Sequence, residues 1–400
     1  DEEETPFDRT LRQLGLFLSV LGFKQSSLQS VMASWTWFLV VGVLFPLITL
    51  ELSTCSGCET GQIQRFEIGI VAAQAFLAGS ALLCLSHNLR KHGVKRFLFV
   101  DRYSGHEERF STHYLGRISD SMGLFLLCFI PCVLLKVGRE ILRFVFVERQ
   151  SPWHSFALLL AFTLSWSYVT SVIISASILF RLVCCLQIVH LDDYLKLLER
   201  EGSSVMELLQ EHARLRYCLS KISHRFRIFL LAQLVIVTVV QVVFLFHTTG
   251  FSEINVINGG DFAVSTIVQV VGVVLCLNAS AKISHRAQQI GAMASKWHAF
   301  VTASCSEDDS SISRAAPYEA GGGNSTRHND SGSDLEPFFN LPPPPSTASY
   351  QKRLALVLYL QANPGGISVY GWTVDRSLIN TIFCLELSLV TFVLSKTIVV

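Results

Sequence analysis

Six small polar side chains recur along the last apolar stretch of the chain, residues 377–397. They are spaced by three and four residues, so in a helix they form one stripe along its whole length. The six are Ser377, Thr381, Cys384, Ser388, Thr391 and Ser395. Two interpretations stay open: small residues let helices pack closely inside a membrane, and a polar row can form a water-facing wall along which ions pass.

Glu386 is the only acid deep within this stretch. An ionised carboxylate costs several kcal/mol near the centre of a bilayer, so such a group is protonated, paired or in contact with water. We therefore include Glu386 among the pore-lining candidates. The alternative is a buried, protonated hydrogen-bond donor.

Aromatic and polar side chains in the expected outer halves of other apolar stretches could line a small-molecule cavity. Ligand pockets are mostly apolar with a few well-placed polar groups, which this set resembles. Its members are Gln74, Phe76, Phe129, Phe162, Trp166, Thr266 and Gln269. For each residue taken alone, ordinary packing is the alternative.

Cys55 and Cys58 form the C-x-x-C pair of the chain. A structural zinc site needs about four ligands, and no further ligands stand beside this pair, so a disulfide and free thiols are the two main alternatives. Motifs for hydrolases, phosphate-binding loops, dinucleotide sites and metal-ligand clusters are missing from the sequence. We expect no enzyme activity, no cofactor and no metal.

The composition is typical of an integral membrane protein. Half of the 400 residues are hydrophobic and 16% are charged, whereas about a quarter are charged in an average soluble domain. A membrane-spanning helix needs about 20 consecutive apolar residues. Seven stretches approach or exceed that length: 35–52, 66–86, 118–137, 154–180, 226–247, 262–281 and 377–397. We predict an all-α, multi-pass membrane protein with seven transmembrane helices.

Lys and Arg are unevenly divided among the eight segments that flank these stretches. The odd-numbered flanks carry 26 of the 32 basic residues. Cytoplasmic flanks accumulate Lys and Arg, so the N-terminus is expected inside and the C-terminus outside. The weak point is the flank after the third stretch, where Lys136, Arg139, Arg143 and Arg149 are expected in an outside loop. The near-neutral net charge of +1 gives no indication of a nucleic-acid partner.

Two long runs without Gly or Pro meet at Gly202. Helices of such length exceed the bilayer thickness, so spans four and five should continue into the cytoplasm. We divide the chain into spans 1–6 with a cytoplasmic stalk (1–302, the stalk at about 181–227 and 282–300), a disordered linker rich in Ser, Gly and Pro (303–348), and a cytoplasmic helix with span seven (349–400). The stalk either packs on itself or contacts other subunits.

The C-terminal region carries a family resemblance. Gly-Trp-Thr-Val-Asp-Arg (371–376) leads into the last span, which contains Leu-Glu-Leu (385–387) and Leu-Ser-Lys (394–396). This resembles a plant membrane family of one uncharacterised domain, described as gustatory-receptor-like. That family is similar in layout to insect gustatory and odorant receptors. Insect receptors end with Thr-Tyr, five hydrophobic residues and Gln-Phe, whereas Thr391 and Phe392 here precede Ser395 and Lys396.

The resemblance implies a homotetramer in which the last span of each subunit lines one cation pore and a small-molecule ligand binds among the outer parts of spans two to six. The leading function hypothesis is thus a ligand-gated, weakly selective cation channel or chemoreceptor-like protein in the plasma membrane or an endomembrane. The alternative is a non-conducting scaffold or adaptor that acts through its cytoplasmic loops.

Overall fold

A computed structural model describes residues 6–52, 61–98, 107–146, 152–199, 204–250, 256–312 and 347–398. These residues are nearly all helical. The chain divides into two compact units. Unit 1 comprises Asp1–His190, Leu215–His285 and Gly366–Val400, and unit 2 comprises Leu191–Arg214 and Arg286–Gly365.

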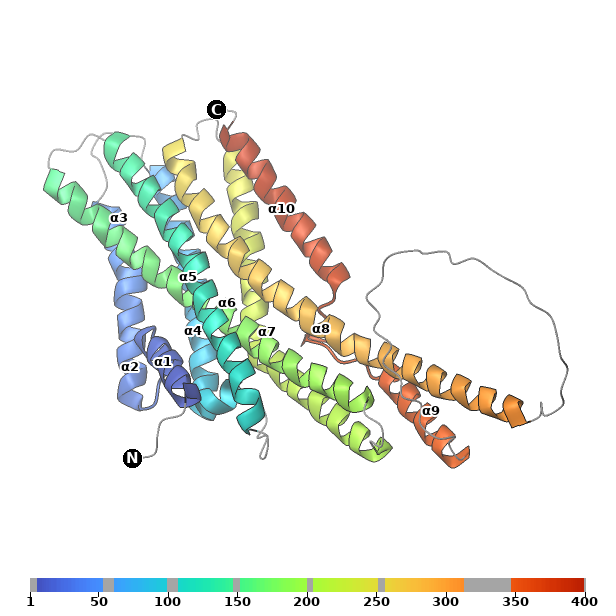
Figure 1. The fold of residues 1–400 in the computed structure, drawn as a ribbon. Helices are drawn as coiled ribbons and strands as arrows, with labels where there is room; N and C mark the ends of the chain where they lie inside the picture. The colour runs from blue at the N-terminus through green and yellow to red at the C-terminus, as the bar shows by residue number, and fades with distance from the viewer. Residues whose placement is uncertain are drawn as a thin grey trace, which may run out of the picture. The chain divides into compact units, whose positions relative to one another are not determined.

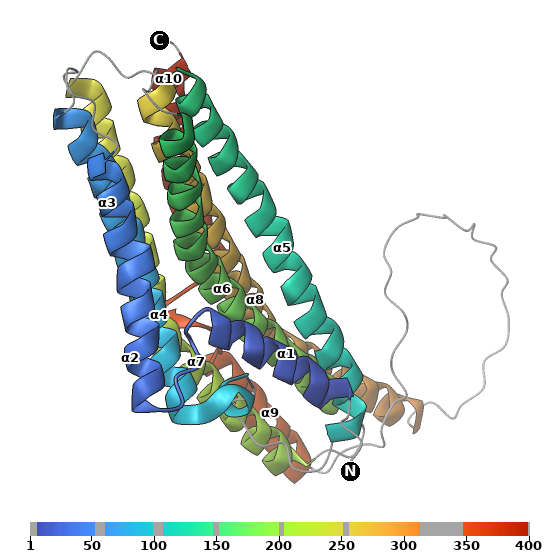
Figure 2. The ribbon, with the colours of Figure 1, turned by 90° about the vertical axis from the view of Figure 1, so that its left-hand side faces the viewer.

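Unit 1 is a helical bundle (Figure 1 and Figure 2). Its elements begin with α1 (Pro6–Val20), α2 (Leu28–Trp37), the π-helix η1 (Phe38–Leu44) and α3 (Phe45–Leu52). The long helices α4 (Gly61–Leu98), α5 (Glu107–Phe146), α6 (Pro152–Glu199), α7 (Val205–Gly250) and α8 (Val256–Ile312) follow. The hairpin of β1 (Ser368–Val369) and β2 (Trp372–Thr373) leads into α10 (Arg376–Ile398). Helices α6, α7 and α8 each contribute part of their length to both units.

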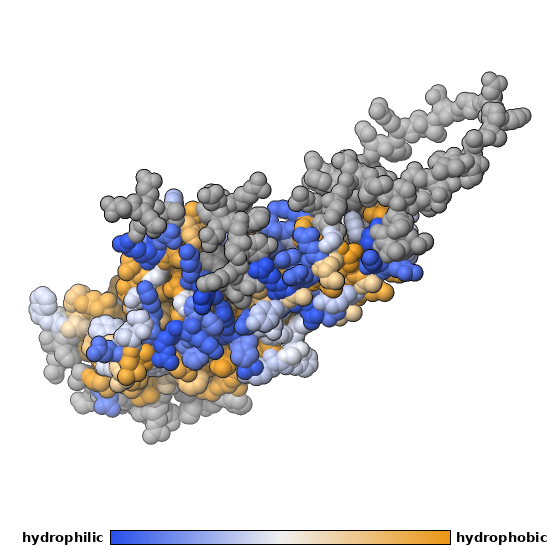
Figure 3. Space-filling model, turned by 90° about the horizontal axis from the view of Figure 1, so that it is seen from below, coloured by the Kyte–Doolittle hydropathy of each residue, from blue (hydrophilic) through white to orange (hydrophobic). Residues whose placement is uncertain are grey.

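Six helical segments of the described chain are long and apolar enough to cross a membrane. They are Leu28–Glu51, Glu67–Leu98, Tyr114–Leu142, Phe156–Glu199, Val205–Val243 and Gly260–Ala303. Helix α10 is the seventh candidate, and its 23 residues correspond to about 34 Å at 1.5 Å per residue. The prediction of an all-α, multi-pass membrane protein is confirmed. Seen from below, one face of the molecule gathers hydrophilic side chains, with hydrophobic ones at its sides (Figure 3).

One part of the interior of unit 1 lies where α5, α6 and α8 meet. A cluster of buried apolar side chains joins them, with Phe125 from α5, Trp166 and Ile174 from α6, and Val268 from α8. Helix α1 packs against the same region, since the rings of Phe17 and Phe125 meet edge to face with centroids 5.0 Å apart. Burial of these side chains fixes the faces that the long helices turn toward one another.

The first span contains a π-helical segment that Pro46 explains. The N–H of Phe45 bonds the carbonyl of Val40, five residues back, and Pro46 has no N–H with which to continue to the carbonyl of Val41. Instead, the hydroxyl of Ser165 on α6 donates to that carbonyl at 2.6 Å. An acceptor released by proline is thereby satisfied from a neighbouring helix, as a membrane interior requires. This helix begins at Leu28, seven residues before the predicted start.

Two copies of the same pentapeptide, Lys-Ile-Ser-His-Arg at 221–225 and 282–286, hold the hairpin before α10. The Ile367 N–H donates to Ser284 Oγ and the Ser368 N–H donates to Ser223 Oγ, both at 3.1 Å. The two-residue turn has positive φ at Tyr370 and Gly371, the combination typical of a type I′ hairpin. The hairpin thus ties the start of α10 to both α7 and α8.

Unit 2 combines the α6–α7 hairpin, the C-terminal part of α8, and α9 (Thr347–Ala362). The Tyr194 hydroxyl donates to the carbonyl of Leu208 at 3.1 Å, and Gln361 donates to Ser295 at 2.8 Å. Helix α8 continues to Ile312, ten residues past the predicted boundary at 302, and most of the predicted linker lies outside the described residues. Apolar side chains of the predicted stalk are buried within this unit, Leu191, Leu198 and Leu208 among them.

Candidate functional site: a buried ion cluster beside an aromatic cavity

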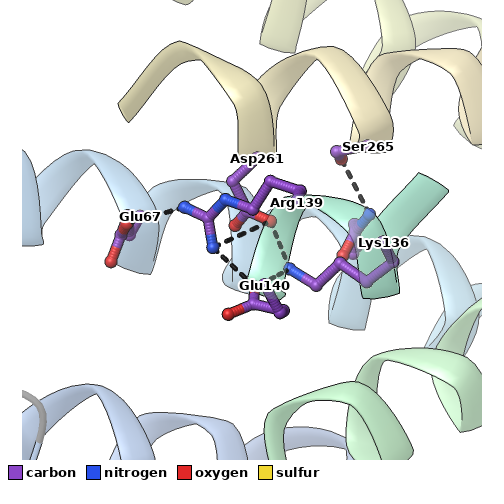
Figure 4. A network of polar contacts seen from close by, with 7 residues as sticks. Glu67, Lys136, Arg139, Glu140, Asp261 and Ser265 are labelled. Carbon is purple, nitrogen blue, oxygen red and sulfur yellow. Dashed lines mark hydrogen bonds and ion pairs between the residues drawn. The ribbon is translucent and has the colours of Figure 1, made fainter. Parts of the chain in front are cut away.

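Five charged side chains from three helices are buried together in unit 1 (Figure 4). We call them the ion cluster. Glu67 comes from α4, Lys136, Arg139 and Glu140 come from α5, and Asp261 comes from α8. Lys136 is fully buried and the other four are at most 7% exposed. A charge inside a membrane protein is expensive unless it is paired, so the pairing within the cluster decides its stability.

Each basic side chain of the ion cluster contacts more than one acid. Lys136 Nζ lies 3.0 Å from Glu140 Oε1 and also bonds Asp261 Oδ1. Arg139 Nη1 lies 2.5 Å from Glu140 Oε1 and 3.8 Å from Asp261 Oδ1, while its Nη2 lies 3.3 Å from Glu67 Oε1. These shared carboxylates join α4, α5 and α8.

Helical spacing explains why α5 contributes three members. Positions 136, 139 and 140 are separated by three and four residues, which places their side chains on one face of a helix. Asp261 and Glu67 lie near the beginnings of their membrane-spanning segments. Gly260 leaves room for the arginine, because a Cβ there would lie 3.3 Å from Arg139 Cγ.

An aromatic cavity adjoins the ion cluster. Lys136 Nζ lies 4.4 Å from the ring centroid of Phe162 and 5.7 Å from that of Trp166, within the range of cation–π attraction. Both rings line a cavity of about 10 Å³ together with Gln74 and Ser165. The Gln74 amide donates to Ser265 Oγ at 2.7 Å. The cavity is about the size of one water molecule.

The structure brings three of the seven predicted ligand-pocket residues to this cavity: Gln74, Phe162 and Trp166. Phe129 lies nearby, because it packs against the apolar cluster that includes Trp166. Thr266 and Gln269 are buried on α8 but do not line the cavity.

Phe76 does not line this cavity. Its side chain is 67% exposed, because two residues along a helix turn it about 200° away from Gln74.

The buried amide of Gln269 stands out among these positions. Neither its Nε2 nor its Oε1 has a hydrogen-bond partner among the described residues, and the hydroxyl of Thr266 on the same helix has none either. Gln241 on α7 has an equally unpaired buried amide. Unsatisfied polar groups inside a bundle cost free energy, so these three positions favour polar contacts with water or a ligand.

The polar stripe of α10 is exposed along its length. Ser377, Thr381, Cys384, Ser388, Thr391 and Ser395 are all on the surface of unit 1. The hydroxyls bond carbonyls of their own helix: Thr381 to Ser377 at 3.0 Å and Thr391 to Leu387 at 2.8 Å, for example. The side chain of Glu386 lies outside the described residues. Among the described residues of one chain, the stripe therefore faces no other helix.

Most members of the ion cluster were missed from the sequence. The expectation that Lys136 and Arg139 lie in a loop was wrong, because α5 continues through both residues to Phe146. The available signal was the helical spacing of Lys136, Arg139 and Glu140, together with acids at the starts of two other apolar stretches. A count of basic residues by flank does not use that spacing.

The remaining predictions concern the cysteines and possible metal ligands. Cys55 and Cys58 lie outside the described residues. Eight cysteines of the described chain are free thiols. No group of three or more potential metal ligands occurs within the described part of the chain.

Two solved structures share this fold. The insect olfactory receptor OR5 from Machilis hrabei in complex with eugenol matches with a TM-score of 0.58 at 9% identity, over 97% of this chain and 98% of that one. The OR5 structure described without eugenol matches with a TM-score of 0.56 at 10% identity, over 96% and 97%. The layout predicted from the resemblance to insect chemoreceptors agrees with this similarity.

A comparison with curated proteins gave no significant match. The family model described as "Protein of unknown function (DUF3537)" matches residues 9–385. That match spans nearly every element of unit 1 and all of unit 2, including the ion cluster and the first half of α10. The chain therefore belongs to the DUF3537 family, and it has the fold of an insect olfactory receptor.

Proposed function

We propose that the protein is a ligand-responsive, chemoreceptor-like membrane protein whose α10 helices together line a weakly selective cation path in a homo-oligomer. The observation that carries the proposal is the exposed polar stripe of α10. Polar side chains on a membrane helix favour contact with water or with another helix over contact with lipid, and the described part of one chain supplies no such cover.

Similarity to a receptor whose structure contains eugenol supports a small-molecule ligand. A homotetramer is the assembly that the resemblance to insect chemoreceptors implies. It would place four stripes around one axis.

The aromatic cavity is the ligand site that we favour. At about 10 Å³ it is far below the roughly 300–1,000 Å³ of ordinary ligand pockets. A ligand must therefore displace the Phe162 or Trp166 ring. Lys136 lies over both rings, so a movement of either ring would disturb the contacts of Lys136 with Glu140 and Asp261. The ligand would thereby change the packing of α5 against α8.

The orientation remains that predicted from the basic residues, with the N-terminus in the cytoplasm. It is tested by labelling cysteine-tagged termini with a membrane-impermeant reagent on intact cells. Labelling of a C-terminal tag is expected. Labelling of the N-terminal tag alone would mean that the orientation is the opposite of the predicted one.

Conduction is tested with purified protein in planar bilayers and a panel of small aromatic ligands. We expect ligand-dependent cation current that Ser388→Leu reduces several-fold, because the larger apolar side chain narrows a wetted path. The matched control is Ile382→Leu, a volume-conserving change on another face of α10, which should leave the current unchanged. Equal currents for both variants would refute a path along the stripe.

The alternative is a non-conducting scaffold or adaptor. One observation favours it: four stripe hydroxyls, those of Thr381, Ser388, Thr391 and Ser395, already bond carbonyls of their own helix, so they do not require water and suit close helix packing. A stable oligomer without current, together with binding partners that are lost when residues 313–346 are deleted, would select this function.

A further inference from the structure

A groove on the surface of unit 1 has the chemistry of a lipid site. It lies between α7, α8 and α10 and has a volume of about 320 Å³, within the range of ligand-binding pockets. Val273, Val274 and Leu277 from α8 face Phe383 and Leu387 from α10 across it. The groove-lining positions on α10 differ from those of the polar stripe, so an occupant would leave the stripe uncovered.

The groove has a polar end and an apolar end. Arg376, the first residue of α10, lines it together with Asn380 one turn later and Asn278 from α8. All three are exposed. From Arg376 to Leu387 the groove follows about 16 Å of helix at 1.5 Å per residue. The remaining lining is almost entirely hydrophobic.

The polar end is positively charged. Arg376 has no ion-pair partner among the described residues, and the neighbouring Asp375 is engaged in capping α10, where its Oδ1 accepts the N–H of Leu378 at 2.9 Å. Lys282, one turn beyond Asn278 on α8, is exposed as well. Basic side chains at the end of a membrane-spanning helix attract anionic headgroups.

We propose that this groove binds one anionic phospholipid of the surrounding bilayer. One of its acyl chains lies against the valines of α8 and Phe383, and its phosphate accepts hydrogen bonds from Arg376 and the two asparagine amides. An amphiphile matches both ends of the groove. Charge complementarity with Arg376 favours this occupant over an uncharged apolar helix from a second copy.

Native mass spectrometry of the full chain in detergent tests the proposal, with phosphatidylglycerol and phosphatidylcholine of identical acyl chains as probes. One basic residue near a membrane surface favours anionic lipid by about fivefold in affinity. Arg376→Gln should therefore weaken phosphatidylglycerol binding by about that factor and weaken phosphatidylcholine binding less, because the choline cation already offsets the charge of the same phosphate. The control Lys352→Gln, an exposed basic residue on α9, should alter neither.

A second variant tests the apolar half of the groove. Val274→Trp fills it and should abolish the tight binding of both lipids, whereas Val243→Trp, an exposed valine of α7 outside the groove, should not. If Val274→Trp does not elute as a single species in gel filtration, the electron paramagnetic resonance spectrum of nitroxide-labelled phosphatidylglycerol replaces this test. Wild type should immobilise a larger fraction of the labelled lipid than Arg376→Gln.

Unchanged phosphatidylglycerol affinity in Arg376→Gln would overturn the proposal. So would disulfide formation between two tagged copies carrying Cys384→Ser, one with Val274→Cys and the other with Phe383→Cys. That result would place a second copy in the groove. Neither outcome depends on whether the protein conducts ions.

Discussion

The ion cluster and the polar stripe of α10 are two polar regions of the membrane-spanning helices, and the polar groups in them are paired in opposite ways. Charges of the ion cluster are buried and pair across α4, α5 and α8. Hydroxyls of the stripe are exposed, and those with a partner among the described residues bond carbonyls of their own helix. Removal of a partner therefore breaks a contact between helices in the first region and leaves the second region folded.

The ion cluster therefore concerns the fold of one chain, whereas the polar stripe concerns the assembly of several chains. A buried charge pair contributes to the fold of one chain, because either partner alone would be left charged in an apolar interior. The exposed stripe contributes little to that fold, so its composition points to what surrounds α10 in the assembled protein. Variants of the two regions should differ in which property they change.

The largest effect is expected at the ion cluster. Asp261→Leu leaves Lys136 buried without one of its acids and should lower the free energy of unfolding by about 3–5 kcal/mol. The double variant Lys136→Met/Asp261→Leu removes one charge of each sign and should recover most of the loss. Unfolding in mixed detergent micelles measures both. A double variant as unstable as the single one would mean that these two side chains are not coupled.

A smaller effect is expected where hydroxyls hold the hairpin before α10. Ser284→Ala removes the acceptor of the buried Ile367 N–H and should cost about 1–3 kcal/mol. Ser284→Thr keeps the hydroxyl and should cost less. Hydrogen exchange of the Ile367 amide reports the contact directly, and equal protection in wild type and Ser284→Ala would contradict it.

A loss of about 1 kcal/mol is expected for Ser165→Ala, because the Val41 carbonyl loses its donor. In a Pro46→Ala background the backbone regains an N–H for this carbonyl, so the same serine change should then cost less. Thermal unfolding of the four proteins gives this coupling. Strict additivity would exclude a link between Pro46 and Ser165.

The smallest effect on folding is expected in the stripe. Thr391→Val removes a hydroxyl that bonds its own helix on an exposed face, so the free energy of unfolding of the monomer in detergent should change by less than about 0.5 kcal/mol. Oligomer stability, followed by native mass spectrometry, should change more. A monomer as destabilised as Asp261→Leu would remove the distinction between the two regions.

The sequence by itself determined the class of fold and much of the element plan. Apolar stretches of spanning length predicted the membrane helices, because an isolated backbone in lipid must form helices to satisfy its own polar groups. The cytoplasmic helix expected within residues 349–400 corresponds to α9, Thr347–Ala362. The long helices expected on either side of Gly202 are α6, which ends at Glu199, and α7, which begins at Val205. These features depend on local spacing.

Only the tertiary structure decided which polar groups meet. Glu67, Arg139 and Asp261 are separated by dozens of residues, and nothing in the local pattern of any one helix says that a carboxylate on α4 lies 3.3 Å from a guanidinium on α5. The same holds for the two pentapeptides, whose shared hairpin requires α7, α8 and the segment before α10 to come together. Periodicity specifies a face of a helix, whereas the partner of that face depends on how all the helices pack.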